Sequence, residues 1–147
     1  AEALDVGTSV CAPYIRARRR PRNSPDLFDS FTSLVAAMPK ALCGAGTGLT
    51  AADVDDLHEA GGRLLVSPNI DAEVMGRAMT YNMVTMPGVF TPTEAFLAIR
   101  LGASALKFFP ASVLGASGIA AVRAVLPAEV LIGAVGGVSE KDFAGYK

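Results

Sequence analysis

The chain has 147 residues, of which 51% are hydrophobic, and a formal net charge of -1. This length predicts a single domain over residues 1–147 with a sizeable core. The near-zero charge argues against nucleic acid as a partner, and the lack of a long apolar run argues against a membrane. Cys11 and Cys43 have neither metal-ligand spacing nor a disulfide framework, so we expect a cytoplasmic protein.

The first 22 residues read differently from the rest of the chain, because five arginines fall close together. They are Arg16, Arg18, Arg19, Arg20 and Arg22. Five guanidinium groups exclude a buried strand, since the sequence supplies no evident partners for them. We predict that residues 1–22 form an irregular or disordered arm, with nucleic-acid or phosphate binding as the alternative.

From residue 23 onward, helical and strand patterns alternate. In chain order we expect a helix over 24–38, a strand over 41–47, a helix over 50–61, a strand over 63–69, a helix over 71–81, a strand over 83–86 closed by Pro87-Gly88, a helix over 91–102, a strand over 106–109, a helix around 119–125 and a strand over 130–135. Capping boxes mark two of the helix starts, at Thr50 with Asp53 and at Thr91 with Glu94.

The apolar positions of these helices predict which side chains face the core. We expect Val54 and Leu57 of the second helix and Phe96 and Ile99 of the fourth to be buried. Val74, Ala78 and Tyr81 share one face of the third helix, and Ile119, Val122 and Val125 mark the fifth. His58 is the only histidine, and we expect it on a helix surface, away from any site.

Alternation of continuous apolar strands with helices is typical of successive βαβ units and a parallel sheet. Two architectures fit, a doubly wound open sheet and a (β/α)8 TIM barrel. Because a complete barrel needs roughly 200 residues or more, we predict an incomplete barrel. It would hold approximately strands 3 to 7, with a damaged strand 2 before them.

Lys107 lies in the apolar strand Ala105-Leu106-Lys107-Phe108-Phe109-Pro110. A lysine that is buried without a partner has a lowered pKa, and a neutral amine can form a Schiff base with a carbonyl group. The alternative is a lysine at the end of the strand whose side chain extends into solvent.

Other candidate residues follow the remaining strands, and the carboxyl ends of parallel strands meet at one edge. The Gly136-Gly137 pair can offer backbone N–H groups to an anion, or it can be only a tight turn. Thr47 can likewise be a site hydroxyl or a plain hydroxyl beside a helix. Pro87 follows the apolar strand over residues 83–86, which lies in the chain between Thr47 and the Gly136-Gly137 pair.

Several motifs together resemble the class I aldolases that cleave 2-keto-3-deoxy-6-phospho sugar acids. They are Gly44-Ala45-Gly46-Thr47, Val66-Ser67-Pro68-Asn69-Ile70, Pro92-Thr93-Glu94-Ala95-Phe96, the lysine strand and Ala134-Val135-Gly136-Gly137-Val138. The resemblance covers about residues 23–147. The run Ala124-Val125-Leu126-Pro127 makes the chain more similar to the phosphogalactonate branch than to the phosphogluconate branch.

The resemblance implies that Lys107 forms an iminium ion with 2-dehydro-3-deoxy-6-phospho-D-galactonate, which is then cleaved to pyruvate and glyceraldehyde 3-phosphate. Thr47 would hold the carboxylate end of the substrate, and Pro87 and Phe109 would contact it. Gly136, Gly137 and Val138 would line the phosphate end. The resemblance also implies no cofactor, no metal, and a homotrimer. The phosphogluconate enzyme and a non-catalytic phosphate-binding module or truncated relic remain the alternatives.

One position departs from the family. The resemblance implies a glutamate four residues before Asn23-Ser24-Pro25, as the general acid and base, and this chain has Arg19 there. An arginine does not accept a proton at ordinary pH, so we expect impaired activity. We also hypothesise that residues 8–22 derive from a shifted reading frame or a faulty gene model. Translation of the neighbouring frames tests this.

Overall fold

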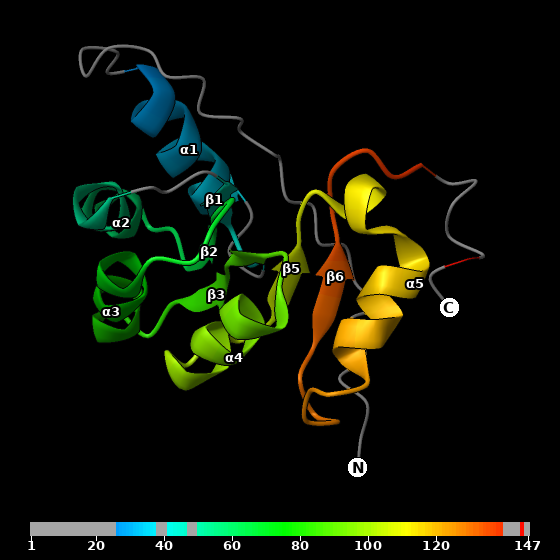
Figure 1. Ribbon diagram of the computed structural model, residues 1–147. Helices are drawn as coiled ribbons and strands as arrows, with labels where there is room; N and C mark the ends of the chain where they lie inside the picture. The colour runs from blue at the N-terminus through cyan, green and yellow to red at the C-terminus, as the bar shows by residue number, and fades with distance from the viewer. Residues whose placement is uncertain (1–25, 38–40, 47–49, 140–144, 146–147) are drawn as a thin grey trace.

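The structure is a computed structural model that describes residues 26–37, 41–46, 50–139 and 145. Within these ranges, helices and strands alternate along the chain, and every strand pair is parallel, as predicted (Figure 1). The helices are α1 (Asp26–Ala37), α2 (Ala51–Glu59), α3 (Ala72–Thr80), α4 (Pro92–Arg100) and α5 (Ala111–Arg123). The strands are β1 (Gly44–Gly46), β2 (Leu64–Val66), β3 (Val84–Met86), β4 (Gly88–Val89), β5 (Leu106–Phe108) and β6 (Ile132–Ala134).

The strands form two ladders, β1-β2-β3 and β4-β5-β6, which meet at Pro87. The prediction that the third strand closes at Pro87-Gly88 was wrong, because the chain continues beyond the proline as β4. Proline lacks an N–H donor, but its carbonyl can still accept a hydrogen bond. The carbonyl of Pro87 accepts one from Lys107 N at 3.0 Å, so β5 runs beside both halves of the interrupted strand.

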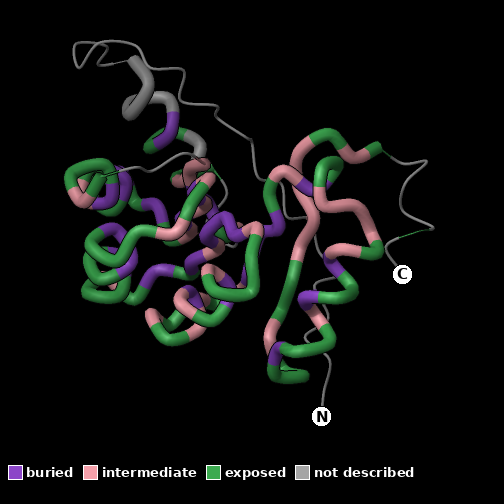
Figure 2. Tube along the Cα trace, viewed as in Figure 1, coloured by how far each residue is buried: buried purple, intermediate pink, exposed green. Residues whose placement is uncertain are grey.

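Two apolar clusters fill the space between the strands and the helices. Figure 2 marks the buried residues along the chain. The first joins α1, α2 and α3 to β1 and β2, and the second joins α4 and α5 to β5 and β6. The first contains Phe31, Cys43, Val54, Leu57, Ala60, Leu65, Val74, Ala78 and Met83, and the second contains Val89, Ala95, Ala98, Leu106, Phe108, Ala111, Ile119, Val122 and Leu126. Strand side chains alternate between faces, so every second residue of β5 packs on helices.

Both predicted capping boxes are present. Thr50 Oγ1 accepts from Asp53 N at 3.1 Å, and Asp53 Oδ2 accepts from Thr50 N at 3.0 Å. At the start of α4, Thr91 Oγ1 accepts from Glu94 N at 3.3 Å, and Glu94 Oε2 accepts from Thr91 N at 2.8 Å. These reciprocal bonds satisfy N–H groups that have no partner within the helix.

The prediction that Phe96 is buried was wrong. Phe96 is 38% exposed, because α4 turns the small residues Ala95 and Ala98 toward the sheet. The expected extension of the fifth helix to Val125 was also wrong, because α5 begins at Ala111 and ends at Arg123. Small residues allow a helix to lie close to the sheet, and a period of apolar residues does not reveal that choice.

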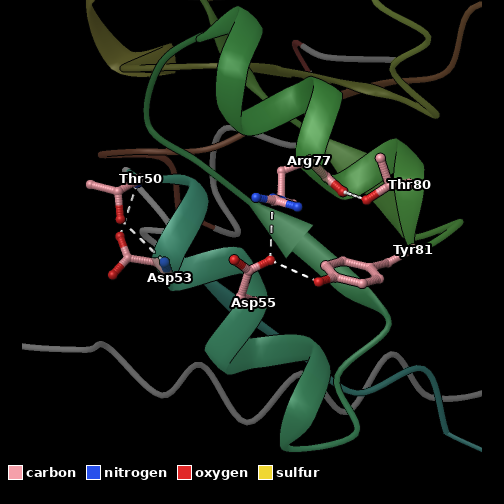
Figure 3. A network of polar contacts seen from close by, with 6 residues as sticks. All are labelled: Thr50, Asp53, Asp55, Arg77, Thr80 and Tyr81. Carbon is pink, nitrogen blue, oxygen red and sulfur yellow. Dashed lines mark hydrogen bonds and ion pairs between the residues drawn. The ribbon is translucent and has the colours of Figure 1, made fainter.

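A polar network joins α2 to α3 on the outside of the molecule (Figure 3). Asp55 pairs with Arg77 at 3.3 Å and accepts a hydrogen bond from the Tyr81 hydroxyl at 2.9 Å. The hydrogen bond to Asp55 raises the pKa of the Tyr81 phenol. His58 is exposed, as predicted, and it stacks on Tyr81 with 3.9 Å between ring centroids. Among the described residues, no helix has the length and apolar character that a membrane crossing requires.

Candidate active site

Lys107 is the central residue of β5, and its side chain lies on the opposite face from its two neighbours. Leu106 and Phe108 are fully buried in the cluster with α4 and α5. Because strand side chains alternate, Lys107 projects from the other face of the sheet, and it is still only 6% exposed. This burial excludes the alternative in which the lysine extends into solvent.

Glycines flank Lys107 on both neighbouring strands. Gly88 of β4 and Gly133 of β6 are its register partners. A Cβ at Gly133 would lie 2.6 Å from the Met86 methyl carbon, and a Cβ at Gly88 would overlap the Pro68 carbonyl. The missing side chains therefore allow the Pro68 backbone to lie against Gly88 and Met86 to lie against Gly133, on the two strands that flank Lys107.

The Lys107 amine lies in an apolar and weakly solvated place. Burial lowers the pKa of its ammonium group below the usual value. Its Nζ is 5.0 Å from the centroid of the Phe109 ring. In the part of the chain that the structure describes, no acidic side chain forms an ion pair with it. The lowered pKa raises the fraction of neutral amine, which is the nucleophilic form, relative to a solvent-exposed lysine.

A glycine turn follows β6 and lies against the segment that follows β5. Gly136 and Gly137 have φ angles of +95° and +71°, which side chains other than glycine rarely adopt. Two backbone bonds hold the turn, from Ala111 N to Val135 O at 2.8 Å and from Ser112 N to Gly136 O at 3.0 Å. A Cβ at Gly136 would lie 2.9 Å from the Phe109 ring, so the ring lies directly against the turn.

The structure thus brings together several of the residues that the sequence singled out. Phe109 contacts both the region of the Lys107 amine and Gly136, and Pro87 holds the Lys107 backbone. Val138 packs against the second apolar cluster on the helix side. Thr47 and Arg19 lie outside the described residues.

Sequence reasoning missed Ser112 and Gly133, and it placed Gly88 at a strand end without linking it to Lys107. Ser112 follows the strand-end Pro110 by two residues, and that position is a signal that could have drawn attention to it. Nothing in the sequence pairs Gly88 or Gly133 with Lys107, because strand register sets those contacts.

The buried lysine and the glycine turn lie at the carboxyl edge of a parallel sheet. This arrangement defines the class of α/β proteins whose functional site is formed at the carboxyl ends of the strands. The pattern of KDPG and KHG aldolases matches residues 8–147. The chain belongs to the KDPG and KHG aldolase family. The match begins at residue 8 and therefore runs through the arginine-rich stretch.

Two relatives of high identity are named for 2-dehydro-3-deoxy-6-phosphogalactonate. The chain is 61% identical over 146 residues to the Rhizobium meliloti (strain 1021) protein named "Probable 2-dehydro-3-deoxy-6-phosphogalactonate aldolase", covering 99% of this chain and 69% of that one. It is 47% identical over 147 residues to the 2-dehydro-3-deoxy-6-phosphogalactonate aldolase of Escherichia coli (strain K12), covering 99% and 71%. The Escherichia coli (strain K12) KHG/KDPG aldolase is 28% identical.

Solved structures share the fold. A structure titled as native KDPGal matches with a TM-score of 0.80 and 46% identity, covering 84% of this chain and 61% of that chain. KDPG aldolase from Legionella pneumophila, with pyruvate captured as a covalent carbinolamine intermediate, matches with a TM-score of 0.75 and 28% identity, covering 85% and 61%. The chain thus spans less than two thirds of the length of either solved relative.

Proposed function

We propose that this chain carries the lysine of a class I aldolase acting on 2-dehydro-3-deoxy-6-phospho-D-galactonate. The observation that carries the proposal is the burial of Lys107 beside Phe109 and the glycine turn, with no acidic partner among the described residues. Burial lowers the pKa of Lys107 and so raises its neutral fraction, and the carbinolamine named for the Legionella pneumophila relative is the product of an amine attacking pyruvate.

In the proposed reaction, Lys107 Nζ bonds to the C2 carbonyl carbon of the substrate, and loss of water leaves an iminium ion. The C4 hydroxyl then loses its proton, and the C3–C4 bond breaks. Its electron pair moves toward the iminium nitrogen and gives an enamine, while C4 leaves as the aldehyde of glyceraldehyde 3-phosphate. The enamine takes up a proton at C3, and hydrolysis of the imine releases pyruvate and the free amine.

We assign the other residues roles from their positions relative to the Lys107 amine. Phe109, which lies between the Lys107 region and Gly136, would cover the carbon chain of the substrate. The turn at Gly136-Gly137, with Val138, would hold the phosphate end. Pro87 would keep the lysine strand in place through its carbonyl bond to Lys107 N. Thr47 would hold the carboxylate, on the resemblance alone.

The proposed activity is impaired in its proton transfer. The family resemblance puts a glutamate where this chain has Arg19. A guanidinium group cannot take the proton from the C4 hydroxyl. Imine formation needs only the amine and a keto acid, so we expect Lys107 to condense with pyruvate even where cleavage of the sugar acid is slow.

Two alternatives stand beside the main proposal. The phosphogluconate enzyme is the nearer one, but relatives named for phosphogalactonate have the higher identities, at 61% and 47% against 28% to 32% for the KHG/KDPG and phosphogluconate relatives. A non-catalytic phosphate-binding module or truncated relic would keep the glycine turn and leave Lys107 unreactive.

The proposal extends to the whole molecule. We infer that the parallel strands are an arc of a (β/α)8 barrel, near strands 3 to 7 of the complete fold, in one domain over residues 1–147 whose part over residues 23–147 is the aldolase-like one. We further propose a homotrimer and a cytoplasmic location. The buried free thiol of Cys43 is compatible with a reducing compartment.

Borohydride trapping tests the proposal directly. The purified chain is incubated with pyruvate, reduced with borohydride and digested, and the Lys107 peptide is weighed by mass spectrometry. We expect a mass increase equal to a reduced pyruvate adduct on that peptide. The variant Lys107→Ala is the control and should gain no adduct. An unmodified Lys107 peptide in the wild-type chain would reject the aldolase proposal and favour the non-catalytic alternative.

A further inference from the structure

We propose that Ser112 is a further binding residue of this site and that its hydroxyl donates a hydrogen bond to the phosphate of the substrate at the Gly136-Gly137 turn. The inference rests on the proposed function, since the phosphate end of that substrate is what the turn is proposed to hold. It adds a side-chain donor that sets specificity for phosphorylated over unphosphorylated ligands.

The backbone of Ser112 is fixed against the turn. Its N–H donates to Gly136 O at 3.0 Å, and the preceding N–H of Ala111 donates to Val135 O at 2.8 Å. Figure 1 shows the first turn of α5 beside the loop that follows β6. Two consecutive bonds therefore hold residue 112 in register with the glycines, which limits where its short side chain can reach.

The Ser112 side chain itself lies on Gly137. A Cβ at Gly137 would overlap Ser112 Oγ, just as a Cβ at Gly136 would come within 2.9 Å of the Phe109 ring. The Cα of Gly136 therefore faces the Phe109 ring, and the Cα of Gly137 faces the Ser112 hydroxyl. Lys107, Phe109 and Ser112 come from one short segment, so the amine, the ring and the hydroxyl follow one another toward the turn.

The Ser112 hydroxyl forms no hydrogen bond within the described part of the chain. The side chain of Ser112 is exposed. Pro110 occupies the N-cap position of α5, where no side chain forms a capping bond. A serine hydroxyl carries one donor hydrogen that rotates to suit an acceptor, so this donor is available to a ligand.

The turn supplies matching donors. Within the described ranges, the N–H groups of Gly136 and Gly137 donate to no other residue. A phosphate group offers several acceptor oxygens, so it can take these N–H groups and the hydroxyl together. Hydrogen bonds to a charged acceptor are stronger than neutral ones, which gives the Ser112 hydroxyl a measurable effect on affinity.

The test measures binding of sn-glycerol 3-phosphate to the full chain by phosphorus NMR, and glycerol, which has no phosphorus signal, is added as the unphosphorylated competitor. We expect Ser112→Ala to weaken sn-glycerol 3-phosphate binding about tenfold. Ser112→Thr, which keeps a hydroxyl, should retain most of the affinity. Ser112→Asp should weaken binding further, because its carboxylate repels phosphate. Ser117→Ala, an exposed serine later in the same helix, is the matched control.

Borohydride trapping with pyruvate separates this inference from the proposed function, because pyruvate has no phosphate. We expect each Ser112 variant to be trapped at Lys107 as fast as the wild-type chain. Loss of phosphate binding with normal trapping supports the inference. Equal binding of sn-glycerol 3-phosphate by Ser112→Ala and the wild-type chain overturns it, as does a wild-type chain that does not distinguish this ligand from glycerol. Parallel loss of trapping and binding in Ser112→Ala also overturns it, because the serine would then be structural.

Discussion

The burial of Lys107 lowers the stability of the folded chain, and the proposed chemistry of this residue explains why it is buried. The side chain is 6% exposed and has no acidic partner among the described residues, so the folded chain must hold its ammonium form in a poorly solvated place. Burial lowers its pKa for that reason. Active-site residues often reduce stability in this way, since the property that makes them reactive is the one that makes them unfavourable to bury.

Replacement of this lysine by an apolar side chain of similar length should stabilise the protein. We expect Lys107→Met to raise the free energy of unfolding at pH 7 by about 1 kcal/mol. The gain should shrink as pH rises. In the window between the lowered folded pKa and an unfolded pKa of about 10.4, the unfolded wild-type chain binds more protons than the folded one, so wild-type stability rises with pH.

Urea unfolding of both chains at several pH values measures this difference. Arg63→Met, at an exposed cation, is the control and should show no such pH dependence. A Lys107→Met chain that is less stable than wild type at pH 7, or a difference that stays constant up to pH 10, would contradict the account of this residue.

At the scale of single elements, the start of α4 depends on local hydrogen bonds. Glu94 accepts from the N–H groups of Phe90 and Thr91, both at 2.8 Å, and from the Thr91 hydroxyl. Burial alone would raise the pKa of Glu94, but these bonds outweigh it and lower the pKa below its usual value. The contribution of this capping box is therefore present above the ordinary carboxyl pKa and is lost as pH falls through the lowered one.

Removal of the cap should have a moderate and localised effect. We expect Thr91→Ala to lower the free energy of unfolding by about 1 kcal/mol, because Glu94 N loses its acceptor. Thr93→Ala changes an exposed threonine in the same turn and should have a much smaller effect. Denaturation midpoints of the two variants provide the comparison. Equal losses in both would mean that the reciprocal bonds of Thr91 and Glu94 do not stabilise the helix.

At the scale of the whole molecule, the outermost strands are β1 and β6, each with one partner in the described part of the chain. At the start of β6 lies an apolar patch formed by the neighbouring residues Leu131 and Ile132, of which Leu131 is 59% exposed. An unpaired strand edge next to apolar side chains tends to associate with another chain. We therefore expect the isolated chain to self-associate through this region.

A charge at the patch should weaken that association. Leu131→Lys keeps the backbone carbonyl that accepts from Leu106 N, and it adds a charge at the strand edge. Sedimentation velocity at several concentrations should show a wild-type coefficient that rises with concentration and a Leu131→Lys coefficient that does not. Phe96→Lys, at an exposed residue of α4, is the control. A wild-type chain that stays monomeric and folded would reject the edge argument.

The order and type of the elements were predictable because their signals lie in neighbouring residues. The capping boxes of Thr50 and Thr91 and the apolar run around Lys107 each need only a few consecutive positions. Prediction failed where tertiary packing determines the structure. The continuation of the third strand past Pro87 depends on a bond to Lys107, and the exposure of Phe96 depends on which face of α4 meets the sheet.

The sequence by itself determined that this protein is a parallel α/β chain with one lysine inside an apolar strand, because hydrophobic period and turn residues are local properties. Only the tertiary structure decided what surrounds that lysine. Strand register set Gly88 and Gly133 beside it, and the bonds from α5 to the glycine turn brought Ser112 against Gly137. These contacts join residues far apart in the chain, and no local pattern specifies such a distance.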